Sequence, residues 1–501
     1  MALHKVLGIE TEYGIVVRGA GESNPVTASS LLINAYVGEL ERQRLAGPKV
    51  GWDFEDESPG TDARGATGPS SPPEVETHLV NAVLTNGARY YVDHAHPELS
   101  TPECADARSI VVFDRAAEEI VKRSIVAANR LLPDGQELVV HKNNSDGKGN
   151  SYGCHENYLM ARSVPFGRIV THATAHFVTR QIFTGSGKVG CEASGTSSAD
   201  VPYQLTQRAD FFEAEVGLET TLKRPIINTR DEPHADAQKY RRLHVIAGDA
   251  NLSEVATFLK VGTTAFLLCL VEDDALPKAF VFRSAVAAMR QVSYDLTLST
   301  GLELVDGSTI TALELQWELL DRSKKWADEH GLDAVGGEAV GTQVLTEWES
   351  VLSGLERDPM EVADRVDWVA KQRMLLGYQE RHGVGWDDPR VAALALQYHD
   401  LRPERSLSDR VGLRTITEPG EVSRAMTDPP TDTRAYFRGT CLKRWASQVV
   451  AANWDSIVFD IGQSSLRRVP MMEPMRGTRA HVGTVLDESA DPAELLARLN
   501  G

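Results

Sequence analysis

Cysteine and long hydrophobic runs are both scarce in this chain. Five cysteines are spread over 501 residues, and no two of them form a C-x-x-C pair. A sparse, odd set argues against a disulfide framework and is typical of proteins from a reducing cytoplasm. The most apolar stretch, residues 263–271, is far shorter than the roughly 20 residues that a membrane helix needs. The N-terminus also lacks the pattern of a signal peptide. We therefore expect a cytoplasmic protein without a membrane partner.

Positive charge is in deficit. The chain has 71 acidic residues against 52 Lys and Arg, which gives a formal net charge of −19. Proteins whose main partner is nucleic acid normally carry a basic surface, so this balance argues against such a partner. The proportions of hydrophobic (42%) and charged (25%) residues are those of a globular enzyme.

The length exceeds what one ordinary core accommodates. We expect a large catalytic domain at residues 1–425 and a small C-terminal domain at residues 426–501. Pro419, Pro429 and Pro430 punctuate the boundary between them.

Neither of the common glycine-rich phosphate-binding motifs is present. No G-x-G-x-x-G follows a predicted strand, and the run GSGKVG at residues 185–190 is not a P-loop, because Val189 follows Lys188. If the protein binds a nucleotide, the phosphates must be met by a metal ion and a few arginines.

The predicted strands precede most of the predicted helices. This order, with long excursions between strands, favours an α+β fold over a doubly wound parallel sheet. The patterns predict strands at residues 4–17, 88–93, 138–141, 151–158, 224–229 and 241–246, and helices at 28–43, 115–131 and repeatedly within 253–398. In the small domain they predict a helix at 441–452, a strand at 456–460 and a basic turn at 467–468.

Residues 46–73 differ in character from the rest of the chain. They are dense in Gly, Pro, Ser and charged residues, and such a segment buries too little apolar surface to order itself. We interpret it as a long mobile loop, which is either functional or a tolerated insertion.

Acidic residues alternate along two predicted strands. Glu10 and Glu12 are two residues apart, so their side chains share one face. Paired carboxylates suit Mg²⁺, although a solvated strand face explains them too. Arg89, Tyr91 and Asp93 share a face in the same way. Asp93 is a candidate general base or nucleophile, and a structural ion pair is the alternative.

Histidines suggest two further kinds of site. His155 and Asn157 share a face after a glycine-rich turn, and His244 lies on a later strand. These groups can contact phosphate or an adenine edge, or can simply cap neighbouring backbone. A zinc site is the alternative for other histidines, at His94-x-His96 and at His172 and His176, but H-A-T-A-H lacks the Glu of H-E-x-x-H. We interpret these four histidines as structural.

Six long motifs, taken in order, resemble the Pup ligase/depupylase family, which acts on the prokaryotic ubiquitin-like protein Pup. The motifs are GIETEYGI, NGARYYVDHAHPELSTPEC, KNNSDGKGNSYGCHENYL, RPIINTRDEPHADAQKYRRLHVIAGDANLSE, DWVAKQRMLLGY and LQYHDLRPERSL. The resemblance runs from Gly8 to about Asp460. It implies a fold related to glutamine synthetase, in which an antiparallel sheet forms a cradle for Mg-nucleotide and a small C-terminal α/β domain is appended.

The family has a ligase branch and a hydrolytic branch, and two features resemble the second. The motif ARYYVDHAHPE resembles that of the hydrolytic branch, and residues 46–73 resemble an insertion that the ligases lack. The resemblance therefore implies a hydrolase that removes Pup from lysine side chains of pupylated proteins and deamidates the C-terminal glutamine of Pup. The alternatives are an ATP-consuming Pup–protein ligase and a non-catalytic Pup-binding scaffold. The sequence leaves the oligomeric state open.

The resemblance also implies roles for individual residues. Asp93 would be the catalytic carboxylate, and Arg230 would meet either the Pup carboxylate or phosphate. Magnesium would be coordinated by Glu10, Tyr91 and Glu98, and the nucleotide, ATP or ADP plus phosphate, would be contacted by Arg89, Thr101, His155, Asn157, His244 and Trp454. Because Pup is acidic, we also expect a groove with local bases, at residues 223–224 or 239–242.

Overall fold

A six-stranded antiparallel sheet forms the centre of the protein, in the order β13-β8-β1-β6-β5-β4. The structure is a computed structural model that describes residues 1–501 except 22, 43–49, 56, 66–78 and 500–501. Along β1, buried and half-buried residues alternate strictly, so one face meets the core and the other is left for function. The six strands are β1 (Leu7–Glu12), β4 (Asn81–Val83), β5 (Arg89–Asp93), β6 (His96–Ser100), β8 (Cys154–Ala161) and β13 (Tyr240–Val245).

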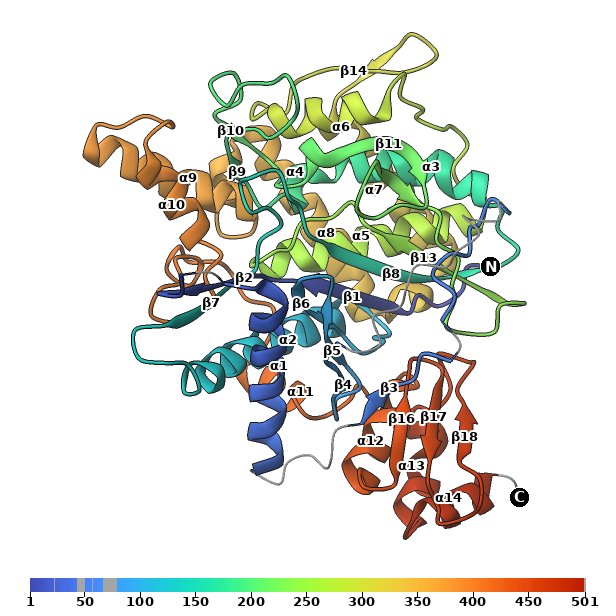
Figure 1. Ribbon diagram of the computed structural model, residues 1–501. Helices are drawn as coiled ribbons and strands as arrows, with labels where there is room; N and C mark the ends of the chain where they lie inside the picture. Colours follow the sequence, from blue (N-terminus) through green and yellow to red (C-terminus); the bar gives the residue numbers. More distant parts are fainter. Residues whose placement is uncertain (22, 43–49, 56, 66–78, 500–501) are drawn as a thin grey trace.

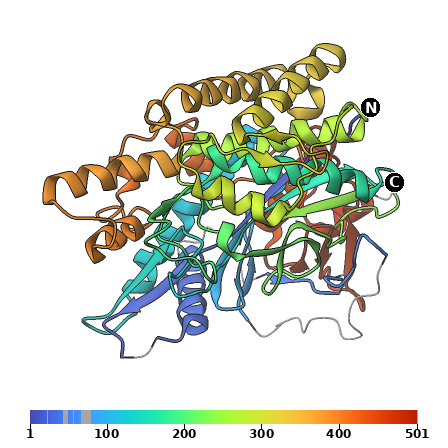
Figure 2. The same cartoon turned by 90° about the horizontal axis from the view of Figure 1, so that it is seen from above.

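Helices cover the core face of this sheet and extend away from it. The buried helix α5 (Glu254–Glu272) contacts β8 as well as α2 (Ala107–Asn129), and α2 also contacts β1. Figure 2 shows the helices between residues 312 and 397, yellow to orange, collected along one side of the molecule. The other helices of this part are α1 (Pro25–Arg42), α3 (Phe166–Thr179), α4 (Gln181–Thr184), α6 (Ala285–Tyr294), α7 (Ala312–His330), α8 (Gly337–Arg357), α9 (Asp367–His382), α10 (Pro389–Gln397) and α11 (Pro419–Ala425), with 3₁₀ helices η1 (Ala209–Phe211), η2 (Asp333–Val335), η3 (Pro359–Val362) and η4 (Ser408–Arg410).

Four two-stranded sheets lie outside the central sheet. In one of them, β11 runs parallel to β12, and the chain continues from β12 to Arg230. The pairs are β2 (Gly14–Arg18) with β7 (Glu137–His141), β9 (Lys188–Val189) with β10 (Tyr203–Gln204), β11 (Phe212–Gly217) with β12 (Arg224–Asn228), and β14 (Leu302–Glu303) with β15 (Thr309–Ile310).

The last elements of the chain have a hydrophobic core of their own, which includes Phe437, Trp445 and Ile457. They form a four-stranded sheet, β18-β17-β16-β3, whose edge strand β3 comes from the N-terminal part of the chain. In Figure 1 the red elements gather at one corner, with the blue β3 against them. The elements are β3 (Gly51–Trp52), α12 (Ala435–Trp445), β16 (Val449–Ala452), β17 (Ser456–Phe459), β18 (Arg467–Pro470), α13 (Arg479–Glu488) and α14 (Pro492–Leu499). The domain boundary expected at residues 425 and 426 stays a prediction.

The mixed content of helices and strands agrees with the sequence, but three local predictions are wrong. Residues 4–17 form two strands, β1 and β2, because the chain changes sheets at Tyr13. The helix expected at 441–452 ends at Trp445, and the β-branched run after it forms β16. The basic turn at 467–468 lies in β18, which pairs with β17. The relation to glutamine synthetase stays a prediction.

The predicted loop at 46–73 lies partly outside the described residues. Its described parts, 50–55 and 57–65, are tied to the fold by regular hydrogen bonds. Gly51 and Trp52 add a parallel strand to β16, and Ala63 N donates to Thr229 O at 2.8 Å. These stretches are therefore paired with neighbouring backbone, which the composition of the segment did not predict.

The apolar stretch at 263–271 belongs to a longer helix than expected. α5 is the one helix in the described part of the chain that is long and apolar enough to cross a membrane, and its apolar window is wholly buried inside the protein. It packs against α2, α3, α7 and α8, so this helix serves as a core element of the fold.

Candidate functional site

The antiparallel register of the central sheet brings the predicted site residues together. Glu10 on β1 pairs with His155 on β8, and Glu12 pairs with Glu98 on β6. On the next strand, Tyr91 pairs with Glu98. Glu10, Tyr91, Glu98 and His155 therefore line one cavity, although they are far apart in the sequence, and Glu12 lies beside Glu98. The same cavity is lined by Arg89, Asp93, Arg230, His244 and Trp454.

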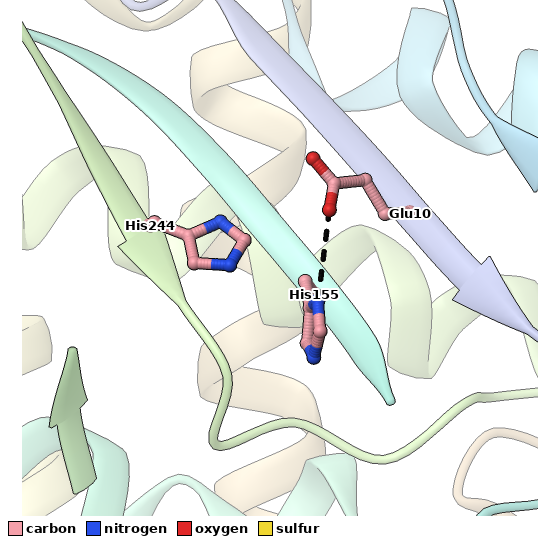
Figure 3. A group of neighbouring side chains, drawn as sticks. All are labelled: Glu10, His155 and His244. Atoms are coloured by element: carbon pink, nitrogen blue, oxygen red, sulfur yellow. Dashed lines mark ion pairs between the residues drawn. The ribbon is translucent and has the colours of Figure 1, made fainter. Parts of the chain in front are cut away.

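The first group of possible metal ligands consists of Glu10, His155 and His244 (Figure 3), and its ligand atoms all lie within 4.8 Å of one another. The His155 Nδ1 atom is 3.6 Å from Glu10 Oε2. Burial alone would raise the pKa of Glu10, but the hydrogen bond from His155 and the charge of Arg242 outweigh it and hold that pKa well below its usual value. Burial, assisted by Arg242, lowers the pKa of His244. The group thus offers an ionised carboxylate beside a neutral imidazole.

The second group consists of Glu12, Asp93 and Glu98, again within 4.8 Å of one another. Burial, together with the nearby charges of Asp93, Glu12 and Glu10, raises the pKa of Glu98 well above its usual value. Three converging carboxylates repel one another unless a proton or a cation neutralises them. Oxygen ligands of this kind fit Mg²⁺, which is a hard cation.

The magnesium ligands expected from the resemblance fall into different surroundings. Glu10 belongs to the first group and Glu98 to the second. Tyr91 is buried, its hydroxyl lies 3.4 Å from Ser100 Oγ, and burial followed by the charge of Glu98 raises its pKa well above the usual value. The phenol is therefore neutral and can offer only an oxygen lone pair.

Asp93 lies at the tight turn between β5 and β6. Its Oδ2 atom is 2.9 Å from Nδ1 of His94, a residue held in the left-handed region at φ +51°. Burial opposes ionisation of Asp93, but the hydrogen bond and charge of His94, with His155, lower its pKa overall. The carboxylate is thus ionised, oriented by a neighbour, and exposed to the cavity.

A second, more apolar cavity adjoins the first. Glu10, Arg242 and Trp454 line both cavities on their shared side. The second cavity is also lined by Leu7, Gly8, Ile9, Thr101 and Asn157. Thr101 Oγ1 accepts a hydrogen bond from Ile9 N at 3.1 Å. The apolar walls beside a strongly polar cavity suit a ligand with one flat apolar end and one charged end.

Asn157 and Arg230 have different partners. Asn157 donates to Glu10 Oε1 at 2.8 Å and accepts from Arg242 at 2.5 Å, so it links the two residues. Arg230 lines the larger cavity, and its Nε atom is buried without a hydrogen-bond partner among the described residues. A guanidinium in that state favours an anionic partner.

The basic groove for Pup, expected at residues 223–224 or 239–242, stays a prediction. Arg242 lies inside the site, 3.8 Å from Glu10, and Arg241 is buried beside Asp231. Lys239 is exposed and already pairs with Glu473 and Asp236. Arg242 and His244 are two residues apart on β13, and this alternation could have placed both on one face.

Trp52 and Glu57 were also missed. Trp52 packs edge-to-face on Trp454, with ring centroids 5.2 Å apart, and Glu57 lines the larger cavity. Both come from the segment expected to be a loop, so periodicity gave no signal for either.

The histidines considered for zinc lie outside both groups of possible ligands among the described residues. His96 Nδ1 is 3.1 Å from the backbone oxygen of Tyr13, and its ring stacks on Tyr152. His176 is buried, with Nε2 3.1 Å from Thr264 Oγ1. These contacts agree with structural roles.

Curated relatives cover this chain from end to end. The depupylase of Acidothermus cellulolyticus is 50% identical, with 100% of both chains covered. The Pup deamidase/depupylase of Mycolicibacterium smegmatis is 45% identical, covering 99% of this chain and 100% of the relative. The Pup–protein ligase of Nakamurella multipartita is 37% identical and covers 81% of this chain and 90% of the relative.

Solved structures share the fold. The Pup ligase PafA in its complex with Pup is 29% identical, with a TM-score of 0.78, and covers 99% of this chain and 95% of that one. PafA in complex with ADP is 34% identical, with a TM-score of 0.73, and covers 81% and 89%. In addition, residues 5–458 match the family described as Pup-ligase protein. The chain is therefore an enzyme that belongs to the Pup-ligase protein family.

Proposed function

We propose that this enzyme hydrolyses amide bonds at the C-terminus of Pup in a reaction that depends on Mg-nucleotide. It releases Pup from lysine side chains of pupylated proteins, and it converts the C-terminal glutamine of Pup to glutamate. Both substrates are amides of the same γ-carboxyl group, so one site serves both reactions. The observation that carries this proposal is the convergence of Glu12, Asp93 and Glu98, of which Asp93 and Glu98 line the larger cavity.

The hydrolytic branch is favoured by two further observations. The depupylase and the deamidase/depupylase cover essentially the whole chain at higher identity than the ligase does. The inserted segment also contributes Phe54, Glu57 and Pro59 to the wall of the larger cavity, so a feature of the hydrolytic branch borders the site.

Asp93 is the catalytic carboxylate in this mechanism. Held ionised and oriented by His94, it either attacks the γ-carbonyl carbon directly or takes the proton from an attacking water. In the first route the amine leaves with a proton from water, and a second water then opens the acyl–aspartate anhydride. In the second route the proton that Asp93 takes from the attacking water passes to the leaving amine. Arg230, whose Nε lacks a partner among the described residues, holds an anionic group of Pup or a phosphate.

Two sets of residues hold the cofactors. Glu10, Tyr91 and Glu98 would hold Mg²⁺, and the carboxylate of Glu12 lies beside Glu98 in the second group of possible ligands. When bound, Mg²⁺ would supply positive charge that polarises the carbonyl oxygen, and the nucleotide phosphates would help to hold the ion. Arg89, His155, Asn157 and His244 would contact the phosphates of the nucleotide. Thr101 and Trp454 border the apolar cavity, which accepts the base.

Incubation with a Pup–protein conjugate, Mg²⁺ and ATP tests this function. Free Pup and inorganic phosphate are followed together over time. We expect free Pup to accumulate without matched release of phosphate. The ligase alternative predicts a stable conjugate, with new conjugate and ADP forming in step when Pup ending in glutamate is supplied with a lysine-bearing target.

A further inference from the structure

The described parts of the inserted segment run along one wall of the larger cavity. The backbone of Asp53 donates to Ala452 O at 3.0 Å, which fixes the start of the segment on β16. Phe54, Glu57 and Pro59 then line the cavity. Beyond them, Asp62 forms an antiparallel bridge with Arg230. Residues 50–55 and 57–65 are thus anchored at both ends, with their middle against the site.

The Arg89 guanidinium lies over two aromatic rings, those of Trp52 and Tyr91. The Arg89 Cζ atom lies 4.0 Å from the centroid of the Trp52 ring and 3.9 Å from that of Tyr91. Its Nε donates to Asn81 Oδ1 at 3.0 Å. Cations at such distances from aromatic faces are attracted to the ring quadrupole. The guanidinium therefore has one orientation.

Trp52 is itself fixed from two sides. Its indole Nε1 donates to Glu57 Oε1 at 2.5 Å, and its ring packs edge-to-face on Trp454. Only 6% of Trp52 is exposed. Glu57 also faces Arg89, with an oxygen 3.9 Å from NH1. Trp52, Glu57 and Arg89 thus form a closed set of contacts, and two of its three members come from the inserted segment.

We propose that Trp52 is a positioning residue, which acts through Arg89 to prepare that guanidinium for the anionic part of the nucleotide. The inference rests on the proposed function, which assigns Arg89 to the nucleotide. A long side chain that is ordered before binding loses less conformational entropy when the ligand arrives.

Calorimetric titration with MgATP in the absence of Pup tests the inference. Trp52→Ala should weaken nucleotide binding by about 3- to 30-fold, the range of a partly buried cation–π contact. Trp52→Phe, which keeps an aromatic face, should retain most of the affinity. In an Arg89→Ala background, Trp52→Ala should cause no further loss, because its effect passes through Arg89. Trp386→Ala is the matched control, since that ring stacks on Tyr203 outside the cavity.

The outcomes separate this inference from the proposed function. A wild-type protein that binds no MgATP overturns the nucleotide dependence and the inference with it. Wild-type affinity in Trp52→Ala overturns the inference alone. An equal loss with and without Arg89 also overturns it, because Trp52 would then act directly on the ligand or on Trp454. Thermal melts of each variant, with Trp52→Phe as the folded reference, exclude loss of structure as the cause.

Discussion

Glu10 on β1 lies directly opposite His155 on β8, and the two side chains meet at 3.6 Å. Two residues further along β1, Glu12 lies opposite Glu98 on β6. Residues two apart on a strand are separated by roughly 7 Å. A single strand thus contributes one carboxylate to each of two neighbouring groups of possible metal ligands, so the spacing of Glu10 and Glu12 sets the spacing of the groups.

Replacement of Asp93 by Asn should reduce hydrolysis of a Pup–protein conjugate by at least about 10²-fold, because a positioned acid or base contributes that much. The amide keeps the size of the side chain but loses the negative charge that His94 orients. The rate of Pup release, followed on gels, measures the effect. Asp328→Asn, an exposed position on α7, is the control. Near-normal cleavage by Asp93→Asn would remove Asp93 from the mechanism.

Replacement of Glu98 by Gln should have opposite effects on the metal-free and the Mg²⁺-bound protein. Without metal, the variant should melt at a higher temperature than the wild type, because a buried carboxyl that Asp93 and Glu12 repel is gone. With Mg²⁺, the variant should gain less stability, because a ligand is missing. Melting curves with and without Mg²⁺ measure both effects, and Glu356→Gln on the exposed surface of α8 serves as the control.

The pH dependence of this variant has a defined sign. The pKa of Glu98 is raised in the folded protein, so the stability that its protonated form contributes is present at low pH and is lost as pH rises through the folded pKa. The advantage of Glu98→Gln without metal should therefore grow with pH. An advantage that shrinks as pH rises would contradict the raised pKa.

The sequence predicted those parts of the site that depend on one strand. Alternation put Arg89, Tyr91 and Asp93 on one face, and all three line the larger cavity. It could not predict which strands are neighbours, because Glu10 and Asn157 meet across 147 residues. That register comes from tertiary packing. The contact of Trp52 with Arg89 was equally inaccessible, because the surrounding composition predicts a loop.

Replacement of Glu103 by Gln should destabilise the contact between the central sheet and the C-terminal elements. Glu103 follows β6 and accepts from Arg434 Nε at 2.7 Å and from Arg438, both in or beside α12. Removal of one partner from a buried ion pair costs about 3 kcal/mol or more. Urea denaturation measures the loss.

The acid dependence provides a check on the Glu103 contact. Burial opposes its ionisation, but Arg438 and Arg434 lower its pKa from 4.5 to about 2. The stabilisation is therefore present above the unfolded pKa and is lost as pH falls through about 2. The difference between the wild type and Glu103→Gln should shrink in that acidic range, and a difference that is constant down to pH 2 would contradict the assignment.

Because of Lys371, the stability of the protein should fall as the pH is lowered from about 10.5 to about 7. The side chain is buried on α9, and burial lowers its pKa from 10.5 to about 7. It donates to Gly187 O at 2.7 Å and to Nε2 of His399, whose Nδ1 donates to Lys142 O at 2.7 Å. His399 Nε2 therefore carries no proton, and a neutral amine satisfies both acceptors.

The sign of this dependence follows from the two states of the chain. Below pH 10.5 Lys371 is protonated in the unfolded chain, whereas in the folded protein it stays neutral until the pH reaches about 7. Replacement by Met removes this proton uptake. The free energy of unfolding of the wild type, minus that of Lys371→Met, should therefore fall by up to about 1.4 kcal/mol for each pH unit by which the pH is lowered across this window. Urea denaturation at several pH values measures the difference. A difference that does not change with pH would show that Lys371 is charged in the folded protein, with Asp367 and Asp249 compensating its burial.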